Sequence, residues 1–259
     1  MTIGKAIRLK KILKDGKTII VPIDHPIEGY FRELEDPRRI VEEIIKGGAD
    51  GVLLRRGSLA KTYDLVAARL AIVYRISGAT FTSGDTADQR VISSVVEAVR
   101  YSADAIVFSV SLAHPKENDM FESFSKLVEE AEGFGLPVIG EVYVWENAKV
   151  DAFEYLRVGV RTLGEEGAAI VKSYFPSDFS LYRDLVRYSL VPVIAAGGPK
   201  MDSPRKVLEF VKAVMDAGAV GTCIGRNVWQ QESPSKMIRA MRKIVREGAS
   251  VEEALSELQ

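Results

Sequence analysis

The residue with the most specific chemical potential is a lysine at the end of an apolar run. Lys172 closes the segment Ala-Ala-Ile-Val-Lys at residues 168–172, which is typical of a buried strand. Burial disfavours the charged form of an amine, and a neutral amine attacks ketones to form a Schiff base. We therefore expect the pKa of Lys172 to be lowered toward about 7–8. A lysine that reaches solvent or pairs with a carboxylate would explain the same position.

Three further side chains have types that suit such a reaction. Tyr143 and Glu141 stand two residues apart, on one face of a predicted strand, and either group could transfer the proton of a substrate hydroxyl. Asp24 follows another apolar run and could balance the charge of an imine or bind a hydroxyl. Packing of the tyrosine and an Asx turn at Asp24, beside Pro26, are the structural alternatives.

Small residues follow two apolar runs in the last quarter of the chain: Ala196, Gly197, Gly198 and Gly225. Glycines allow backbone N–H groups to approach an oxyanion, and residues 227–230 could form a helical turn whose N-terminus faces it. Arg226 would add a charge-assisted contact. The pattern predicts a phosphate site, with two tight turns and a solvated arginine as the alternative. His25 could contact the ligand or lie on the rim.

The chain alternates short β-rich runs with longer helical patterns. Strands are predicted at residues 18–23, 51–54, 79–82, 105–109, 137–143, 168–172, 191–196 and 221–225. Helices are predicted at residues 37–47, 62–77, 93–102, 119–134, 151–166, 178–188, 204–218 and 234–248. Asp36 and Ser177 are the expected N-caps of the first and sixth of these helices.

Eight strand–helix units over about 240 residues match a single (β/α)8 barrel that spans residues 1–259. A doubly wound open sheet is the alternative, but it would favour G-x-G-x-x-G after the first strand, and this motif is absent. Active sites of barrels lie at the carboxyl ends of the strands. The candidate residues above all occupy such ends, so we expect them to form one site.

Composition excludes several classes of function. Lys and Arg total 35 against 36 Asp and Glu, so nothing indicates a nucleic-acid binder. No apolar run approaches about 20 residues, so no membrane span is expected. The only cysteine rules out an intrachain disulfide and favours the cytoplasm. Two histidines exclude a three-histidine zinc site, and only seven Asn and Gln residues suggest a thermophile.

Five segments together resemble the archaeal-type class I fructose-bisphosphate aldolases. They are Ile-Asp-His at 23–25, Gly-Ala-Asp-Gly-Val at 48–52, Ile-Val-Lys at 170–172, Ala-Ala-Gly-Gly-Pro-Lys at 195–200 and Gly-Arg-Asn-Val-Trp-Gln at 225–230. The related aminodideoxyheptulosonate synthases share much of this pattern. The resemblance extends over residues 16–248 in order, and the segments at 27–29 and 55–57 look more like the aldolase branch.

The resemblance implies a (β/α)8 barrel that cleaves or forms a phosphorylated ketose without a metal or other cofactor. It matches Lys172 to the Schiff-base lysine, Tyr143 to the acid–base tyrosine and Asp24 to the active-site aspartate. The loops at residues 196–198 and 225–226 match the site for the substrate's ketone-side phosphate. Members of the family form homo-oligomers, often built from pentamers.

Two departures separate this chain from the family pattern. His25-Pro26 stands where the family has His-Gly, and Gly29 replaces a histidine. Residues 143–146 read Tyr-Val-Trp-Glu in place of Tyr-Pro-Arg-Gly. The missing arginine would have held a distal phosphate, so aldol chemistry is predicted more firmly than fructose 1,6-bisphosphate itself. A transaldol enzyme like 2-amino-3,7-dideoxy-D-threo-hept-6-ulosonate synthase, or a barrel that binds or isomerises phosphosugars without covalent chemistry, remain alternatives.

Overall fold

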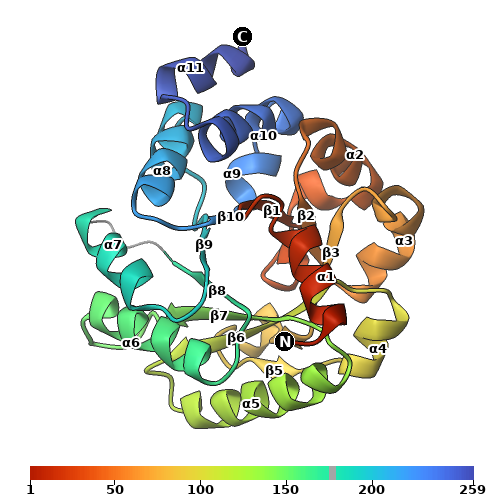
Figure 1. The fold of residues 1–259 in the computed structure, drawn as a ribbon, viewed down its shortest axis with the longest axis vertical. Helices are drawn as coiled ribbons and strands as arrows, with labels where there is room; N and C mark the ends of the chain where they lie inside the picture. Colours follow the sequence, from red (N-terminus) through yellow and green to blue (C-terminus); the bar gives the residue numbers. More distant parts are fainter. Residues whose placement is uncertain (175–178) are drawn as a thin grey trace.

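Eight short apolar runs pair side by side in a closed parallel barrel (Figure 1). The computed structural model describes residues 1–174 and 179–259. The barrel strands are β1 (Thr18–Pro22), β2 (Gly51–Leu54), β3 (Ala71–Arg75), β6 (Ala105–Leu112), β7 (Val138–Val144), β8 (Ile170–Ser173), β9 (Val193–Ala196) and β10 (Gly221–Cys223). Their order around the barrel is β1-β10-β9-β8-β7-β6-β3-β2. This arrangement confirms the predicted (β/α)8 fold.

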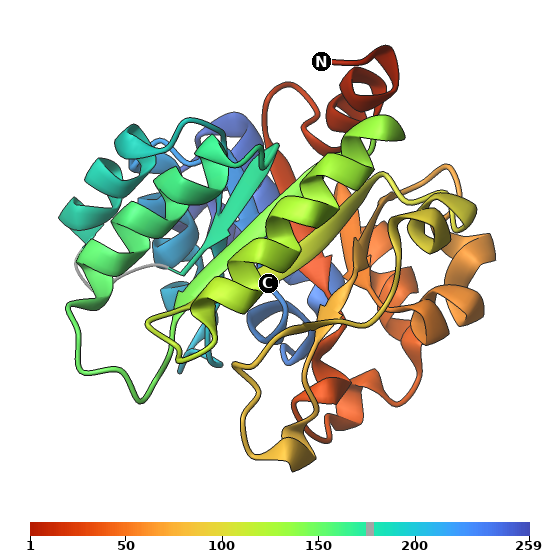
Figure 2. The same cartoon turned by 90° about the horizontal axis from the view of Figure 1, so that it is seen from below.

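Helices surround the barrel, and α5 packs along β6 (Figure 2). They are α1 (Ile3–Ile12), α2 (Pro37–Gly47), α3 (Arg56–Val66), α4 (Val95–Arg100), α5 (Glu117–Gly133), α6 (Ala152–Glu165), α7 (Phe179–Tyr188), α8 (Pro204–Asp216), α9 (Arg226–Trp229), α10 (Pro234–Arg242) and α11 (Val251–Leu255). A π-helical turn, η4 (Lys243–Glu247), follows α10, so the helix predicted at 234–248 is regular only in its first part. None of the described helices has both the length and the apolar character needed to cross a membrane.

Helix α2 illustrates how local sequence sets the boundaries of an element. Asp36 is the N-cap and accepts a hydrogen bond from the Arg38 amide at 2.9 Å, and proline occupies the first helical position. Gly48 ends the helix with φ of 78°, a left-handed conformation that glycine adopts without strain. The cap expected at Ser177 lies outside the described residues.

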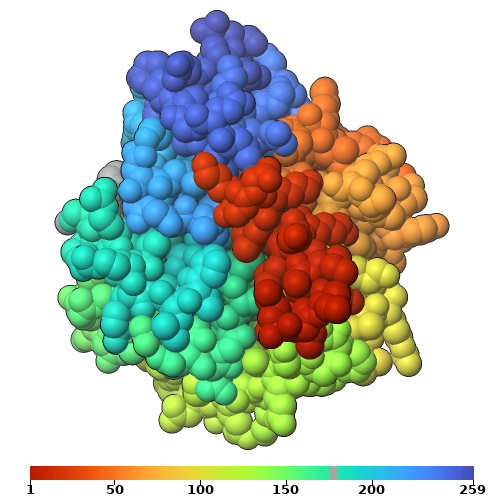
Figure 3. All heavy atoms as spheres, in the orientation of Figure 1, coloured from red at the N-terminus to blue at the C-terminus, as the bar shows by residue number. Residues whose placement is uncertain are grey.

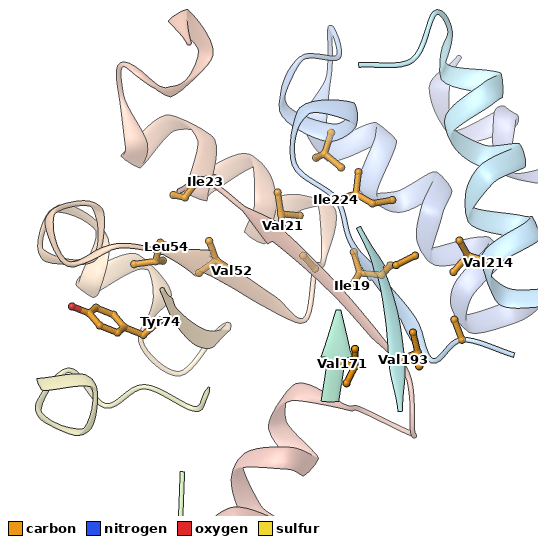
Figure 4. Packing of buried hydrophobic residues seen from close by; sticks show 14 of the residues in the cluster. Ile19, Val21, Ile23, Val52, Leu54, Tyr74, Val171, Val193, Val214 and Ile224 are labelled. Atoms are coloured by element: carbon orange, nitrogen blue, oxygen red, sulfur yellow. The ribbon is translucent and has the colours of Figure 1, made fainter. Parts of the chain in front are cut away.

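The two faces of the barrel strands form two separate cores. Outward-facing residues pack against the helices, as Figure 4 shows for Val21, Val52 and Val193. Inward-facing residues such as Val73, Ile139 and Ile170 fill the barrel interior. Helix α1 lies across one end of the barrel (Figures 1 and 3), where Ile12 packs on the inner core. Helix α1 therefore covers the barrel interior at the amino ends of the strands.

The third predicted strand, at residues 79–82, is wrong, and so is the extent of the helix predicted at 62–77. Helix α3 ends at Val66, and the third barrel strand is Ala71–Arg75. The chain reverses at Ala68, whose φ of 61° lies in the left-handed region. Alanine rarely adopts this conformation, so the residue type gives no signal of a turn. Residues 81–83 instead form the 3-10 turn η3 (Phe81–Ser83), beside the small hairpin of β4 (Ser77–Gly78) and β5 (Arg90–Val91).

Gly221 on β10 lies so close to the Thr18 backbone on β1 that we expect a side chain at this position to destabilise the fold. Its φ is 151°, and an added Cβ would lie 1.9 Å from the Thr18 carbonyl oxygen. Gly221→Ala should therefore lower the free energy of unfolding by about 3 kcal/mol or more, measured by denaturant titration. The control is Gly133→Ala at the end of α5, where a Cβ meets no described atom within 4 Å. Equal stabilities of the two variants would contradict this account of barrel closure.

Candidate active site

A pocket of about 200 Å³ opens at the carboxyl ends of the barrel strands. All the residues predicted for the site line it: Asp24, His25, Tyr143, Lys172, Ala196, Gly197, Gly198, Gly225 and Arg226. We call this the lysine pocket. The structure thus brings together groups that lie up to about 200 residues apart in the chain. Their chemical roles stay predictions at this point.

Strand alternation places the polar groups of the pocket directly above the inner apolar core. Every second residue of a strand faces the same side, so Arg75 follows Val73 inward, Glu141 follows Ile139, and Lys172 follows Ile170. Glu141 and Lys172 are register partners on β7 and β8. Their side chains therefore meet in the closed interior of the barrel.

Four buried side chains form a row of alternating charge, which we call the charge row: Asp24, Arg75, Glu141 and Lys172. Arg75 Nε donates to Asp24 Oδ2 at 2.7 Å, and Arg75 Nη1 donates to Glu141 Oε2 at 2.7 Å. Glu141 Oε1 accepts from the Lys172 ammonium. Each residue is at most 8% exposed. The two positive and two negative charges sum to zero, which lets the row exist away from water.

Ser109 links two members of the charge row. Its hydroxyl donates to Glu141 Oε2 at 2.6 Å and lies 2.6 Å from Arg75 Nη1, which donates to it. Glu141 therefore has partners on both carboxylate oxygens. The geometry fixes Glu141 beside the lysine with little rotational freedom.

The expected depression of the Lys172 pKa is wrong for the resting protein. Burial by itself would lower the pKa, but the negative charges of the Cys223 thiolate, which forms only at high pH, and of Glu141 together outweigh burial and hold the Lys172 pKa above its ordinary value. Burial raises the pKa of the Cys223 thiol to about 11, so this group is neutral at neutral pH. Glu141 is consequently the partner that keeps Lys172 protonated there.

The acidic members of the row stay ionised, while the neighbouring histidine stays neutral. Burial opposes ionisation of both carboxyls, but Arg75 and the other nearby cations together outweigh it and hold the pKa values of Asp24 and Glu141 below their usual range. Burial, assisted by Lys172, lowers the pKa of His25 to about 4 even though Asp24 is near. His25 Nδ1 lies 3.7 Å from Asp24 Oδ1 and makes no hydrogen bond within the described part of the chain.

Tyr143 stands at the outer edge of the same face as Glu141. Its ring packs edge-on against Tyr174, with 6.1 Å between the ring centres. Burial and the charge of Glu141 raise the pKa of Tyr143 above its ordinary value. The side chain is therefore a neutral phenol at neutral pH, able to donate a proton into the pocket.

The glycine loops that line the pocket form one connected unit. Asn227 is fully buried, donates to the carbonyls of Gly197 and Pro199 at 2.9 Å, and accepts from the Met201 amide at 2.7 Å. An added Cβ at Gly225 would lie 2.6 Å from the His25 ring.

Arg226 follows Gly225 at the start of α9, and no carboxylate of the described residues pairs with it. We call residues 197–198 and 225–226 the anion cradle. Backbone amides and an arginine that pairs with no described carboxylate suit an anionic group.

Arg75 is the member of the charge row that the sequence did not predict, and Ser109 and Tyr174 are further pocket residues that it did not predict. Arg75 falls within the helix predicted at 62–77, whereas in the structure it is the last residue of strand β3. The signal was present in the β-branched run Ile-Val at residues 72–73 followed by Tyr-Arg, which is typical of a buried strand with a polar end. Among the described residues, no three His, Cys, Asp or Glu side chains are arranged to hold a metal ion.

Replacement of Arg75 tests the electrostatic account of the site. Arg75→Met leaves Asp24 without its cation and should lower the free energy of unfolding at pH 7 by about 3–5 kcal/mol. Because Arg75 depresses both carboxyl pKa values, its loss lets them rise, and protonation then relieves the penalty. The deficit relative to wild type should therefore shrink between pH 7 and pH 5.

Denaturant unfolding at the two pH values measures this effect, with Arg75→Lys as the charge-conserving control that should lose less stability. A deficit that stays constant with pH would rule out carboxylate desolvation as its origin.

Comparison with known proteins agrees with the geometry. A family model described as DeoC/LacD family aldolase matches residues 18–231. A 2-amino-3,7-dideoxy-D-threo-hept-6-ulosonate synthase of Archaeoglobus fulgidus is 30% identical over 98% of this chain and 95% of its own length. A protein of the same name from Halobacterium salinarum is also 30% identical, over 98% of this chain and 96% of its own length.

Solved structures extend the likeness to three dimensions. A Schiff-base-forming fructose-1,6-bisphosphate aldolase superposes with a TM-score of 0.85 at 29% identity, over 93% of this chain and 99% of its own. An archaeal fructose-1,6-bisphosphate aldolase with its catalytic lysine covalently bound to a carbinolamine intermediate gives 0.84 at 27% identity, with the same two shares covered. The family match covers most of the chain and the whole barrel from β1 to β10. This protein therefore belongs to the DeoC/LacD family of aldolases.

Proposed function

We propose that this aldolase works through a Schiff base on Lys172 and makes or breaks a C–C bond of a phosphorylated ketose. The observation that carries the proposal is the placement of the Lys172 amine. It lies inside the lysine pocket, in contact with Glu141, and the anion cradle lines the same pocket. A ketone whose phosphate occupies the cradle would present its carbonyl within the same small volume.

The anion cradle supplies the orientation of the substrate. Asn227 ties its two loops together, so the backbone at residues 197–198 and 225–226 keeps its shape without substrate. Arg226 adds a positive charge beside the amides of α9. Such a rigid site fixes one end of a phosphorylated ketone, which converts the attack on its carbonyl into an intramolecular step.

Glu141 supplies the proton transfers of Schiff-base formation. The Lys172 ammonium gives a proton to Glu141, and the neutral amine bonds to the ketone carbon while the π pair moves to oxygen. Glu141 then returns a proton to that oxygen, takes one from nitrogen, and donates again as water leaves. The sum converts ammonium and ketone into iminium and water, and Glu141 ends as a carboxylate. The short contact between the two groups supports this relay.

Tyr143 acts in the C–C bond step. Glu141, as a carboxylate, takes a proton from the carbon beside the iminium, which gives an enamine whose carbon attacks the aldehyde carbon. The aldehyde oxygen takes the phenol proton of Tyr143 as the iminium re-forms. The Tyr143 phenolate then regains a proton from Glu141 through water, and hydrolysis of the iminium releases the product. The raised pKa of Tyr143 supports a phenol poised as an acid, and cleavage runs through the same states in reverse.

Asp24 and Arg75 hold the charge of the intermediate in place. Arg75 keeps Asp24 ionised, so a fixed negative charge is available in the pocket when the iminium forms. Asp24 can also accept a hydrogen bond from a substrate hydroxyl. Neither group needs to move during the reaction, which favours electrostatic preorganisation.

The curated relatives favour a second substrate pair within the same chemistry. Two proteins named 2-amino-3,7-dideoxy-D-threo-hept-6-ulosonate synthase are 30% identical to this chain over nearly its full length. The transaldol reaction would use the same Schiff base with a different acceptor.

The family resemblance also supports a cytoplasmic homo-oligomer built from pentamers, and the scarcity of Asn and Gln supports a thermophilic source.

The covalent step predicts a specific adduct. With dihydroxyacetone phosphate and borohydride, the wild-type protein should gain the mass of a reduced Schiff base on Lys172, read by peptide mass spectrometry. Lys172→Met should lose both the adduct and turnover while it keeps its fold, because methionine fills a similar volume. Tyr143→Phe should keep the adduct and lose about 10²–10⁴-fold in turnover.

Circular dichroism provides the control for folding of both variants. Unchanged turnover in Lys172→Met would overturn the proposal. A folded wild-type protein that turns over phosphorylated ketoses but gives no adduct would favour the non-covalent alternative.

A further inference from the structure

A second, larger pocket adjoins the lysine pocket on the side of Tyr143. Its volume is about 710 Å³, and we call it the outer pocket. Thr86, Tyr143 and Tyr174 line both pockets. The anion cradle lines the lysine pocket alone. A substrate that reacts at Lys172 therefore has its phosphate on one side and the outer pocket on the side of the acid–base tyrosine.

The walls of the outer pocket are aromatic and apolar, and their only ionisable charges besides the tyrosines are acidic. The ring-bearing side chains are Phe81, Tyr143, Trp145, Phe153 and Tyr174. The two carboxylates are Asp85 and Glu146. Among the described residues, no Lys, Arg or His lines this pocket. A phosphate bound here would meet two negative charges with no compensating cation, which disfavours it.

Part of this wall is held in place before any ligand enters. The Trp145 amide donates to the Leu112 carbonyl at 2.9 Å, and the Trp145 ring packs edge-on against His114 with 5.1 Å between ring centres. His114 Nε2 in turn lies 2.9 Å from Asp85 Oδ2. Trp145 and Asp85 are thereby coupled across the pocket wall, so the aromatic surface is preformed.

We propose that the outer pocket binds the acceptor aldehyde, and that this aldehyde is uncharged and carries an apolar chain of aromatic size. The inference rests on the proposed function, because it takes Lys172 as the site of the donor enamine. The enamine carbon bonds to the aldehyde carbon, and the aldehyde oxygen takes the proton of Tyr143. The chain of the aldehyde then packs on Trp145 and Phe153, where aromatic contact and burial stabilise it.

An acceptor competition tests this inference. The wild-type protein first undergoes borohydride trapping with dihydroxyacetone phosphate, which establishes the donor Schiff base. Aldol formation is then measured with phenylacetaldehyde and with glyceraldehyde 3-phosphate. We expect kcat/KM to be at least about tenfold higher for phenylacetaldehyde, which corresponds to about 1.4 kcal/mol.

Two variants assign the preference to the outer pocket. Glu146→Arg supplies the missing cation and should shift the ratio of kcat/KM values toward glyceraldehyde 3-phosphate by about tenfold or more. Trp145→Ala should lower kcat/KM for phenylacetaldehyde while the adduct on Lys172 is unchanged. Glu129→Arg on α5 is the matched control, because Glu129 is exposed, lines neither pocket and should leave the ratio as in wild type.

The outcomes separate this inference from the proposed function. Trapping without a preference for phenylacetaldehyde, or a preference for the phosphorylated aldehyde, overturns the acceptor class and leaves the Schiff base intact. Failure of trapping in the folded protein overturns the proposed function and with it the acceptor inference. A ratio that Glu129→Arg changes as much as Glu146→Arg also overturns the inference, because general charge then explains the effect.

Discussion

The contact on which the site depends is the one between the Lys172 ammonium and the Glu141 carboxylate, at one end of the charge row. Taking each charge out of water costs several kcal/mol, and only close alternation with the opposite sign offsets that cost. Arg75 makes the alternation possible because one guanidinium reaches both carboxylates. The closed parallel barrel supplies the geometry, since strand register sets Glu141 opposite Lys172.

This arrangement separates the resting state of the lysine from its reactive state. Lys172 rests as a cation, although burial alone would favour the neutral amine. In the proposed mechanism, the transfer of one proton from Lys172 to Glu141 creates a neutral pair without moving net charge through the barrel. The proposed mechanism places the substrate's phosphate at the anion cradle, which does not line the outer pocket proposed for the acceptor. Tyr143 lines both pockets, and the proposals together divide recognition into an anionic half and an apolar half.

Much of this arrangement could be predicted from the sequence, because the alternation of side chains along a strand indicates which residues face the barrel interior. The spacing of Glu141 and Tyr143 fixed their common face, and the apolar run before Lys172 indicated its inward direction. The position of Arg75 was not predicted because no glycine or proline marks the chain reversal at Ala68. The residues around it favour a helix, so the start of β3 was not recognised. The direction of the Lys172 pKa shift was not predicted for a different reason. It depends on which carboxylate lies beside the amine on the neighbouring strand, and the sequence of one strand does not determine its register with the next.

The most direct test of the charge row is the protonation state of Lys172 in the free protein. Lysine labelled at Cε can be titrated by NMR, with Lys172→Met identifying the signal. The account predicts that Lys172 stays protonated past the ordinary lysine pKa of about 10.4, and that Glu141→Gln moves its midpoint to lower pH. A wild-type midpoint near neutral pH, unchanged in Glu141→Gln, would contradict the account.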